Sequence, residues 1–74
     1  MQKTFYEYVQ TYRGGDWEDA RARFAEAAFY DEAFPKQSTD FEELCAYVEM
    51  IADEYLTTET FDTLWDSYAA KYSL

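Results

Sequence analysis

Residues 57–72 read TTETFDTLWDSYAAKY and carry the clearest helical pattern in the chain. The apolar side chains recur three or four positions apart, which places them on one face of a helix. They are Phe61, Leu64, Trp65, Tyr68 and Tyr72. Thr57 or Thr58 can cap the amino end, because a threonine hydroxyl accepts hydrogen bonds from the first backbone N–H groups. We therefore expect a helix that reaches about Lys71 and buries an aromatic stripe.

A first helix is expected near the amino end, over about residues 5–13. Thr4 and Glu7 stand three positions apart, as in a capping box. The apolar face would hold Phe5, Tyr8, Val9 and Tyr12. Residues 14 and 15 are both glycine, which takes the left-handed conformation that ends many helices.

The second helix is expected to start after Asp16, which can cap it, and to run to about Tyr30. Glu18 and Asp19 would then lie in the first turn, where negative charge suits the positive end of the helix dipole. The apolar face of this segment would hold Trp17, Ala20, Phe24, Ala27 and Ala28. Its small residues would allow another helix to approach closely.

The stretch 31–40 has no helical period and contains the single proline, Pro35. Proline lacks a backbone N–H and disfavours helical angles at the residue before it, here Phe34. We therefore expect a loop, in which the Phe34 ring can close the open end of a helical bundle.

A third helix is expected over about residues 41–52, with Thr39 or Asp40 as its cap. Its apolar face would hold Phe41, Leu44, Cys45, Val48 and Ile51. None of the expected helices is long enough to be stable alone, so each must bury its apolar face against the others. The predicted fold class is all-α: a compact bundle of four to five short helices that forms one domain over residues 1–74.

Composition agrees with a small folded domain. Phe, Trp and Tyr make up 22% of the 74 residues, so large rings can fill the core of a short chain. The net charge of −10 is uneven: residues 1–37 carry five basic and seven acidic side chains, whereas residues 38–74 carry one basic and nine acidic. The carboxyl-terminal half is either a well-solvated surface or a surface for a partner.

Residue types argue against several kinds of chemistry. The chain has no histidine, which excludes Ser-His-Asp triads, Cys–His pairs and ordinary zinc sites. Carboxylate pairs at helical spacing, such as Glu49 with Asp53, lack the pattern of a calcium or di-iron site. We expect no cofactor, no metal and no enzymatic activity, and a buried, unreactive thiol at Cys45, the single cysteine. Without a long apolar run or a secretion signal, we expect a cytoplasmic protein with no membrane partner.

Several groups of residues, taken together, match one family. They are Phe5 and Tyr6, Tyr12 and Arg13, Phe24 and Ala25, the loop residues Asp31, Phe34, Pro35, Lys36, Ser38 and Asp40, residues 47–49, and Phe61, Asp62, Trp65 and Tyr68. On these residues, nearly the whole chain resembles the YozE family, small bacterial proteins whose fold is similar to the sterile-alpha-motif (SAM) domain. The resemblance implies a SAM-like bundle of short helices. It brings no known activity and so supplies no catalytic residue.

Aromatic residues provide one set of candidate site residues. Sixteen aromatic side chains exceed what four short stripes need, so some should reach the surface. Because protein interfaces are enriched in aromatic rings, an interaction surface is predicted. Its candidate members are Tyr6, Tyr30, Phe34, Lys36 and Tyr55. The alternative is that the rings only complete the core, with the tyrosine hydroxyls reaching water.

Basic residues provide the second set: Arg13, Arg21, Arg23 and Lys36. If helix packing gathers them, they could bind nucleic acid, as some SAM-like folds do, although a chain with a pI near 4.1 supplies few cations for phosphates. The inverse is an acidic protein that mimics DNA. The preferred hypothesis is a non-enzymatic adaptor or regulatory domain that binds an unknown protein partner and is itself a monomer or weak homodimer.

Overall fold

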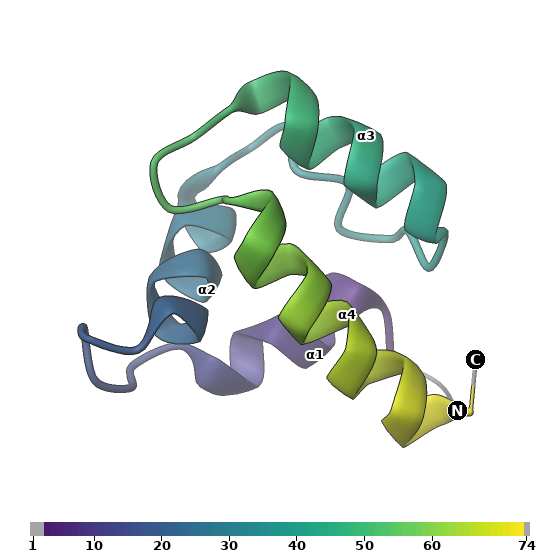
Figure 1. Ribbon diagram of the computed structural model, residues 1–74, viewed down its shortest axis with the longest axis horizontal. Helices are drawn as coiled ribbons and strands as arrows, with labels where there is room; N and C mark the ends of the chain where they lie inside the picture. Colours follow the sequence, from purple (N-terminus) through teal and green to yellow (C-terminus); the bar gives the residue numbers. More distant parts are fainter. Residues whose placement is uncertain (1–2, 74) are drawn as a thin grey trace.

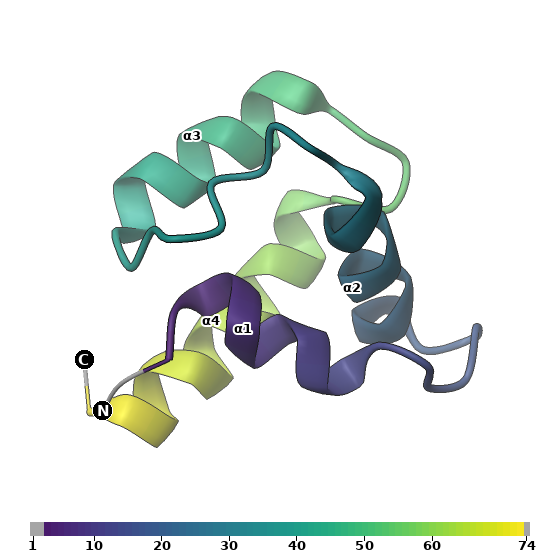
Figure 2. The same ribbon diagram turned by 180° about the vertical axis from the view of Figure 1, so that it is seen from behind.

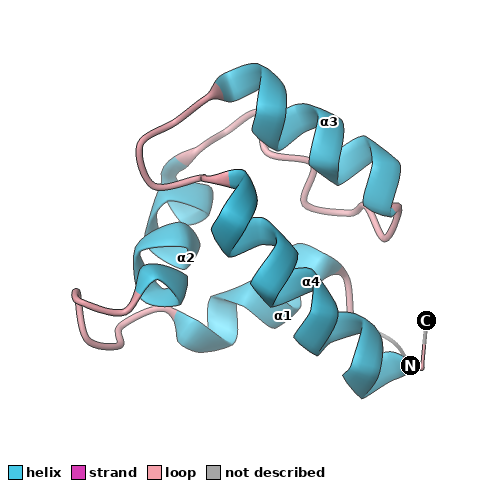
Figure 3. Ribbon diagram, viewed as in Figure 1, coloured by secondary structure: helices cyan, strands magenta, loops and turns pink. Residues whose placement is uncertain are grey.

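The computed structural model describes residues 3–73, which form four α-helices and one 3₁₀ turn (Figure 1). In chain order they are α1 (Phe5–Val9), the 3₁₀ turn η1 (Gln10–Tyr12), α2 (Ala20–Tyr30), α3 (Phe41–Ile51) and α4 (Thr58–Tyr72). No strand occurs in this range (Figure 3). The all-α prediction is confirmed.

The first helix begins where the sequence predicts. The Thr4 hydroxyl accepts from the backbone N–H of Glu7, and the Glu7 carboxylate accepts from the backbone N–H of Thr4, which completes a capping box. The helix then tightens into η1, which ends at Tyr12. Gly14 follows with a φ of 88°, so the chain turns at the glycine pair as expected.

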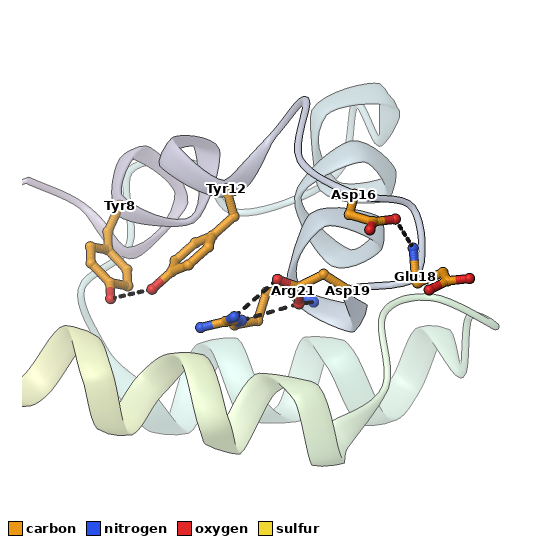
Figure 4. Close-up of polar contacts among 6 residues, drawn as sticks. All are labelled: Tyr8, Tyr12, Asp16, Glu18, Asp19 and Arg21. Carbon is orange, nitrogen blue, oxygen red and sulfur yellow. Dashed lines mark hydrogen bonds and ion pairs between the residues drawn. The ribbon is translucent and has the colours of Figure 1, made fainter.

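The second helix begins later than predicted. Its cap is Asp19, whose carboxylate accepts from the backbone N–H of Arg21. The Asp16 carboxylate instead accepts from the N–H of Glu18, two residues further on, and so stabilises a turn before the helix (Figure 4). The prediction that Asp16 caps the helix was wrong, because aspartate side chains also readily form such turns.

Two large residues assigned to buried faces are exposed. Trp17 lies before α2 rather than on it, and 54% of its surface is accessible. The Trp17 ring packs edge-to-face on Tyr55, with 5.4 Å between ring centroids. Phe41 is 40% exposed at the start of α3, although its ring contacts those of Phe61 and Trp65. The helical period correctly assigns Phe61 and Trp65 to the inner face of α4. It does not predict how deeply a residue at the end of a helix, such as Phe41, is buried.

The last two helices are capped by residues named among the predicted caps. Asp40 accepts from the backbone N–H of Glu42 at the start of α3, and Thr57 accepts from that of Thr60 at the start of α4. The third helix ends at Ile51, and its carboxyl-terminal cap, Ala52, adopts a left-handed φ of 48°. No glycine marks that end.

Helices α1, α2 and α4 pack against one another, whereas α3 closely approaches only α4 among the helices of residues 3–73 (Figure 1). Seen from behind, the segment 31–40 leaves α2 and runs alongside α3 before entering it (Figure 2). This segment therefore lies against a second side of α3, where Asp31 and Phe34 contact Tyr47.

The core is built around the ring of Phe5. Its centroid lies 5.2–6.4 Å from those of four other rings, contributed by α2 and α4. The buried cluster comprises Phe5, Tyr8, Val9, Phe24, Ala25, Ala28, Phe34, Leu44, Val48, Leu56, Phe61, Leu64 and Tyr68. Every α-helix of the described chain thus buries one face in the same cluster. None of these helices combines the length and apolar composition that crossing a bilayer requires.

Candidate functional site

Phe34 is a correction to the predicted interaction surface. Only 3% of its surface is exposed, and its ring packs on those of Tyr6, Phe24 and Tyr47. These three rings come from α1, α2 and α3, so Phe34 fills the space that the helices leave between them. It is a core residue carried by a loop, in agreement with the expectation that it closes the bundle.

A polar contact holds the loop in place. The Tyr47 hydroxyl donates a hydrogen bond to the Asp31 carboxylate, which also accepts from the backbone N–H of Ala33. Partial burial, followed by the hydrogen bond to Asp31, raises the pKa of Tyr47 to about 12. The tyrosine therefore stays protonated at neutral pH, and the pair attaches the start of the loop to α3.

A shallow groove of about 550 Å³ lies on the outer side of α1, η1 and α2. Its lining residues are Tyr6, Gln10, Arg13, Gly14, Glu26 and Phe29. We call it the Arg13 groove. The side-chain amide of Gln10 donates to the carbonyl of Ala25 at 3.1 Å, which fixes η1 against α2.

Arg13 is the central side chain of this groove. The residue is extended after η1, so its side chain crosses onto α2. The guanidinium carbon lies 3.5 Å from the centroid of the Phe29 ring and 5.7 Å from that of Tyr30. Its Nε and Nη2 donate to the two carboxylate oxygens of Glu26, at 3.2 and 3.4 Å. Because residues three and four apart share a helix face, these three α2 residues can contact one side chain.

The electrostatics of the groove keep Arg13 charged. Reduced contact with solvent opposes the charge, but the hydrogen bonds to Glu26 and its negative charge outweigh that effect and raise the pKa of Arg13. Lys36 supplies a second cation, with its Nζ 5.3 Å from the centroid of the Tyr6 ring. Both cations thus lie against aromatic rings that line the groove, Arg13 against Phe29 and Lys36 against Tyr6.

The other two predicted basic residues have different contacts. Arg21 pairs with Asp19, with Nη2 to Oδ2 at 2.9 Å, and lies over the ring of Tyr12 at 4.9 Å (Figure 4). It lines a separate hollow formed with the start of α4. Arg23 donates to the backbone carbonyl of Trp17. The structure therefore divides the predicted basic patch: Arg13 lines the groove, Lys36 lies beside its Tyr6 ring and lines a neighbouring hollow, and Arg21 and Arg23 make local contacts elsewhere.

The predicted aromatic surface is also divided. Tyr6 lines the Arg13 groove, and Tyr30, which is 70% exposed, lies beside Arg13. Tyr55 packs on Trp17 in another part of the molecule. Phe29 is not among the predicted members of this surface, yet it is 40% exposed and its ring supports the Arg13 guanidinium. The sequence does contain a signal for this residue, because Phe29, like Tyr30, lies outside the predicted apolar stripe of α2 and could therefore be expected at the surface.

The described residues offer little for covalent or metal chemistry. Cys45 is only partly buried, which corrects the prediction of a buried thiol, and it donates a hydrogen bond to the Glu49 carboxylate at 3.2 Å. That hydrogen bond, with partial burial, raises the pKa of the thiol. Within residues 3–73, no three aspartate, glutamate or cysteine side chains are arranged to hold a metal ion.

Comparison with known proteins finds relatives that match nearly the whole chain. A family model described as the YozE SAM-like fold matches residues 4–70. A UPF0346 protein of Lactiplantibacillus plantarum is 49% identical over 70 residues, which span 95% of this chain and 96% of that protein. The UPF0346 protein YozE of Bacillus subtilis is 42% identical over 69 residues, 93% of each chain. The UPF0346 protein YuiB of Lactococcus lactis is 42% identical over 65 residues, 88% of this chain and 94% of that one. No solved structure matches at a significant level.

Proposed function

The chain belongs to the YozE SAM-like family, and for this member we propose a non-enzymatic protein-interaction domain whose contact surface is the Arg13 groove. The observation that carries the proposal is the stack of the Arg13 guanidinium on the exposed Phe29 ring, beside the exposed ring of Tyr30. Arginine and tyrosine are among the residues that contribute most to binding at protein interfaces.

The rigidity of the stack supports this role. Glu26 holds the guanidinium through two nitrogens, and Phe29 supports its face. A side chain that is already ordered loses little conformational entropy when a partner binds, so more of the contact energy appears as affinity. The planar guanidinium also fixes the direction in which it donates hydrogen bonds.

Residue chemistry supports the non-enzymatic part of the proposal. The raised pKa of Cys45 keeps its thiol protonated, so it is a poor nucleophile at neutral pH. The Tyr47 hydroxyl has a structural partner in Asp31. A catalytic site needs a nucleophile or base that is available to the reacting atoms, whereas the carboxylate of the Arg13 groove, Glu26, is engaged by two nitrogens of Arg13.

Quantitative affinity capture tests the proposal. The wild-type domain, Arg13→Gln and Phe29→Ser serve as baits in lysate of the source organism, and Arg21→Gln is the matched control because that arginine is also ion-paired and stacked on a ring. We expect partners that wild type and Arg21→Gln retain and that both groove variants lose. A partner set that is the same for all four baits would contradict the proposal. Circular dichroism checks that each variant is folded.

Nucleic-acid binding through the four basic residues has less support, since two of them lie outside the groove. A gel shift at low salt with single- and double-stranded probes tests it. A shift that Arg13→Gln and Arg21→Gln weaken equally would favour nucleic acid over protein as the partner.

A further inference from the structure

We propose that the partner of the Arg13 groove is an acidic protein segment, in which an aspartate or glutamate lies next to an apolar side chain. This inference rests on the proposed function and names the chemistry of the partner at the same site.

Local charge is the first argument. The groove is lined by one cation, Arg13, and one carboxylate, Glu26, which pair with each other, and a second cation, Lys36, lies beside the Tyr6 ring and lines a neighbouring hollow with Glu43. The whole chain, in contrast, has a net charge of −10, and residues 38–74 carry nine acidic side chains against one basic. A basic segment would be attracted to that acidic half and repelled by these two cations. An acidic segment finds complementary charge in Lys36 beside the groove and in the Arg13 donors that Glu26 does not use.

The geometry of Arg13 is the second argument. A guanidinium has five N–H donors, and the hydrogen bonds to Glu26 use the Nε donor and one donor of Nη2. The remaining donors, one on Nη2 and two on Nη1, do not face Glu26, and the Tyr30 hydroxyl is a further hydrogen-bonding neighbour of the guanidinium. A carboxylate of a partner can be bound by these donors while Glu26 keeps the group in place, because arginine readily serves two carboxylates in one plane.

The apolar requirement follows from the rings. Phe29 and Tyr30 pack edge-to-face with 5.1 Å between centroids, and both remain exposed beside the guanidinium. A carboxylate alone would leave this apolar surface in water. A neighbouring leucine, isoleucine, phenylalanine or tryptophan would cover it, and the same contact would exclude water from the ion pair and strengthen it.

Selection from a library of short random peptides tests the chemistry directly. The folded wild-type domain is the target, and Arg13→Gln is used for counter-selection. We expect the enriched peptides to carry an acidic residue adjacent to an apolar one. Enrichment of basic peptides, of polar acidic peptides without an apolar residue, or of no peptide that depends on Arg13 would each overturn the inference.

Affinity measurements on the enriched peptide then locate the contact. Fluorescence polarisation should show an affinity loss of about tenfold or more for Arg13→Gln, the range of an interface hot spot, with a smaller loss for Arg13→Lys. Arg21→Gln should bind as wild type. In heteronuclear NMR, the amide signals that shift should be those of the groove residues, Tyr6, Gln10, Gly14 and Phe29 among them. An equal loss for Arg21→Gln, or shifts centred on α3, would place the contact elsewhere and overturn the assignment.

Two further measurements separate this inference from the proposed function. Sedimentation velocity of the domain alone should be unchanged by Phe29→Ser; a change would identify the occupant as a second copy of the chain. If peptide selection fails while affinity capture still finds a partner that depends on Arg13, the proposed function stands and the acidic chemistry is wrong. If neither depends on Arg13, both fail.

Discussion

The hydroxyl of Tyr68 donates a hydrogen bond of 2.6 Å to the backbone carbonyl of Lys3, 65 positions away in the sequence. The Tyr68 residue is fully buried, and its ring packs on Phe5 and Trp65. The hydrogen bond therefore joins α4 to the segment that leads into α1. Its donor belongs to the aromatic stripe that the helical period predicts, but its acceptor is a backbone atom that no period can identify.

Replacing this tyrosine by phenylalanine tests the contribution of its hydroxyl group. Tyr68→Phe keeps the ring and removes the donor, so we expect the free energy of unfolding to fall by about 1 kcal/mol, the usual net contribution of one such bond. Urea denaturation followed by circular dichroism measures the change. Tyr30→Phe is the control, because Tyr30 is exposed. Equal stability of the two variants would show that the bond to Lys3 contributes nothing.

Phe34 should be far more sensitive to truncation than Phe29. Phe34→Leu leaves a space among three rings in the core, and we expect a loss of about 1–2 kcal/mol in the free energy of unfolding. Phe29→Leu, at an exposed site, should change it by about 0.5 kcal/mol or less. Denaturant unfolding of both variants gives the comparison. The reverse ranking would mean that the loop does not close the core.

The Tyr47–Asp31 contact predicts a pH dependence. The pKa of Tyr47 is raised from 10.0 to about 12, so the folded state holds its proton more tightly than the unfolded state. The stabilising contribution is fully present below pH 10 and is lost as the pH rises through about 12. We expect the free energy of unfolding of wild type to fall more steeply in that interval than that of Tyr47→Phe.

A second variant separates the two causes of that shift. Asp31→Ala removes the hydrogen bond but leaves the phenol partly buried, so its slope should lie between those of wild type and Tyr47→Phe. Denaturant titrations at several pH values give the slopes. If the free energy of unfolding has the same pH dependence in all three proteins, the Tyr47–Asp31 contact is not its source.

Cys45 should react slowly with alkylating agents. Its thiol donates to Glu49, and this hydrogen bond together with partial burial raises its pKa above the ordinary value, so little thiolate forms near neutral pH. We expect the alkylation rate to rise at a higher pH than for a free cysteine. Glu49→Gln should shift the profile to lower pH, because it removes the negative charge beside the thiol. Mass spectrometry of iodoacetamide-treated protein measures both rates, and identical profiles would contradict the assigned contact.

Several features of the fold follow from short-range pattern. The capping box at Thr4 and Glu7 involves side chains and backbone groups within one turn of helix, so the sequence signature contains the whole interaction. The same holds for the threonine cap of α4 and for the stripe that includes Tyr68. The start of α2 was misplaced because Asp16 and Asp19 are both suitable caps, and local chemistry does not choose between them.

Pattern also says little about residues outside the helices. Phe34 stands in a loop whose sequence has no period, and its burial depends on rings from three different helices. The Arg13 groove likewise depends on contacts between distant residues. The Arg13 guanidinium binds Glu26 on α2, which is 13 positions later in the chain. Neither contact leaves a signal at fixed spacing.

Helix formation and capping are governed by interactions within a turn or two, so the chain's own order of residues accounts for the number of helices, their buried stripes and most of their ends. Which cation meets which ring depends on how those helices cross, and crossing is decided by packing among residues distant in sequence. For this reason the all-α fold can be predicted from the sequence of 74 residues, whereas the contact of Arg13 with Phe29 is decided only by the tertiary structure.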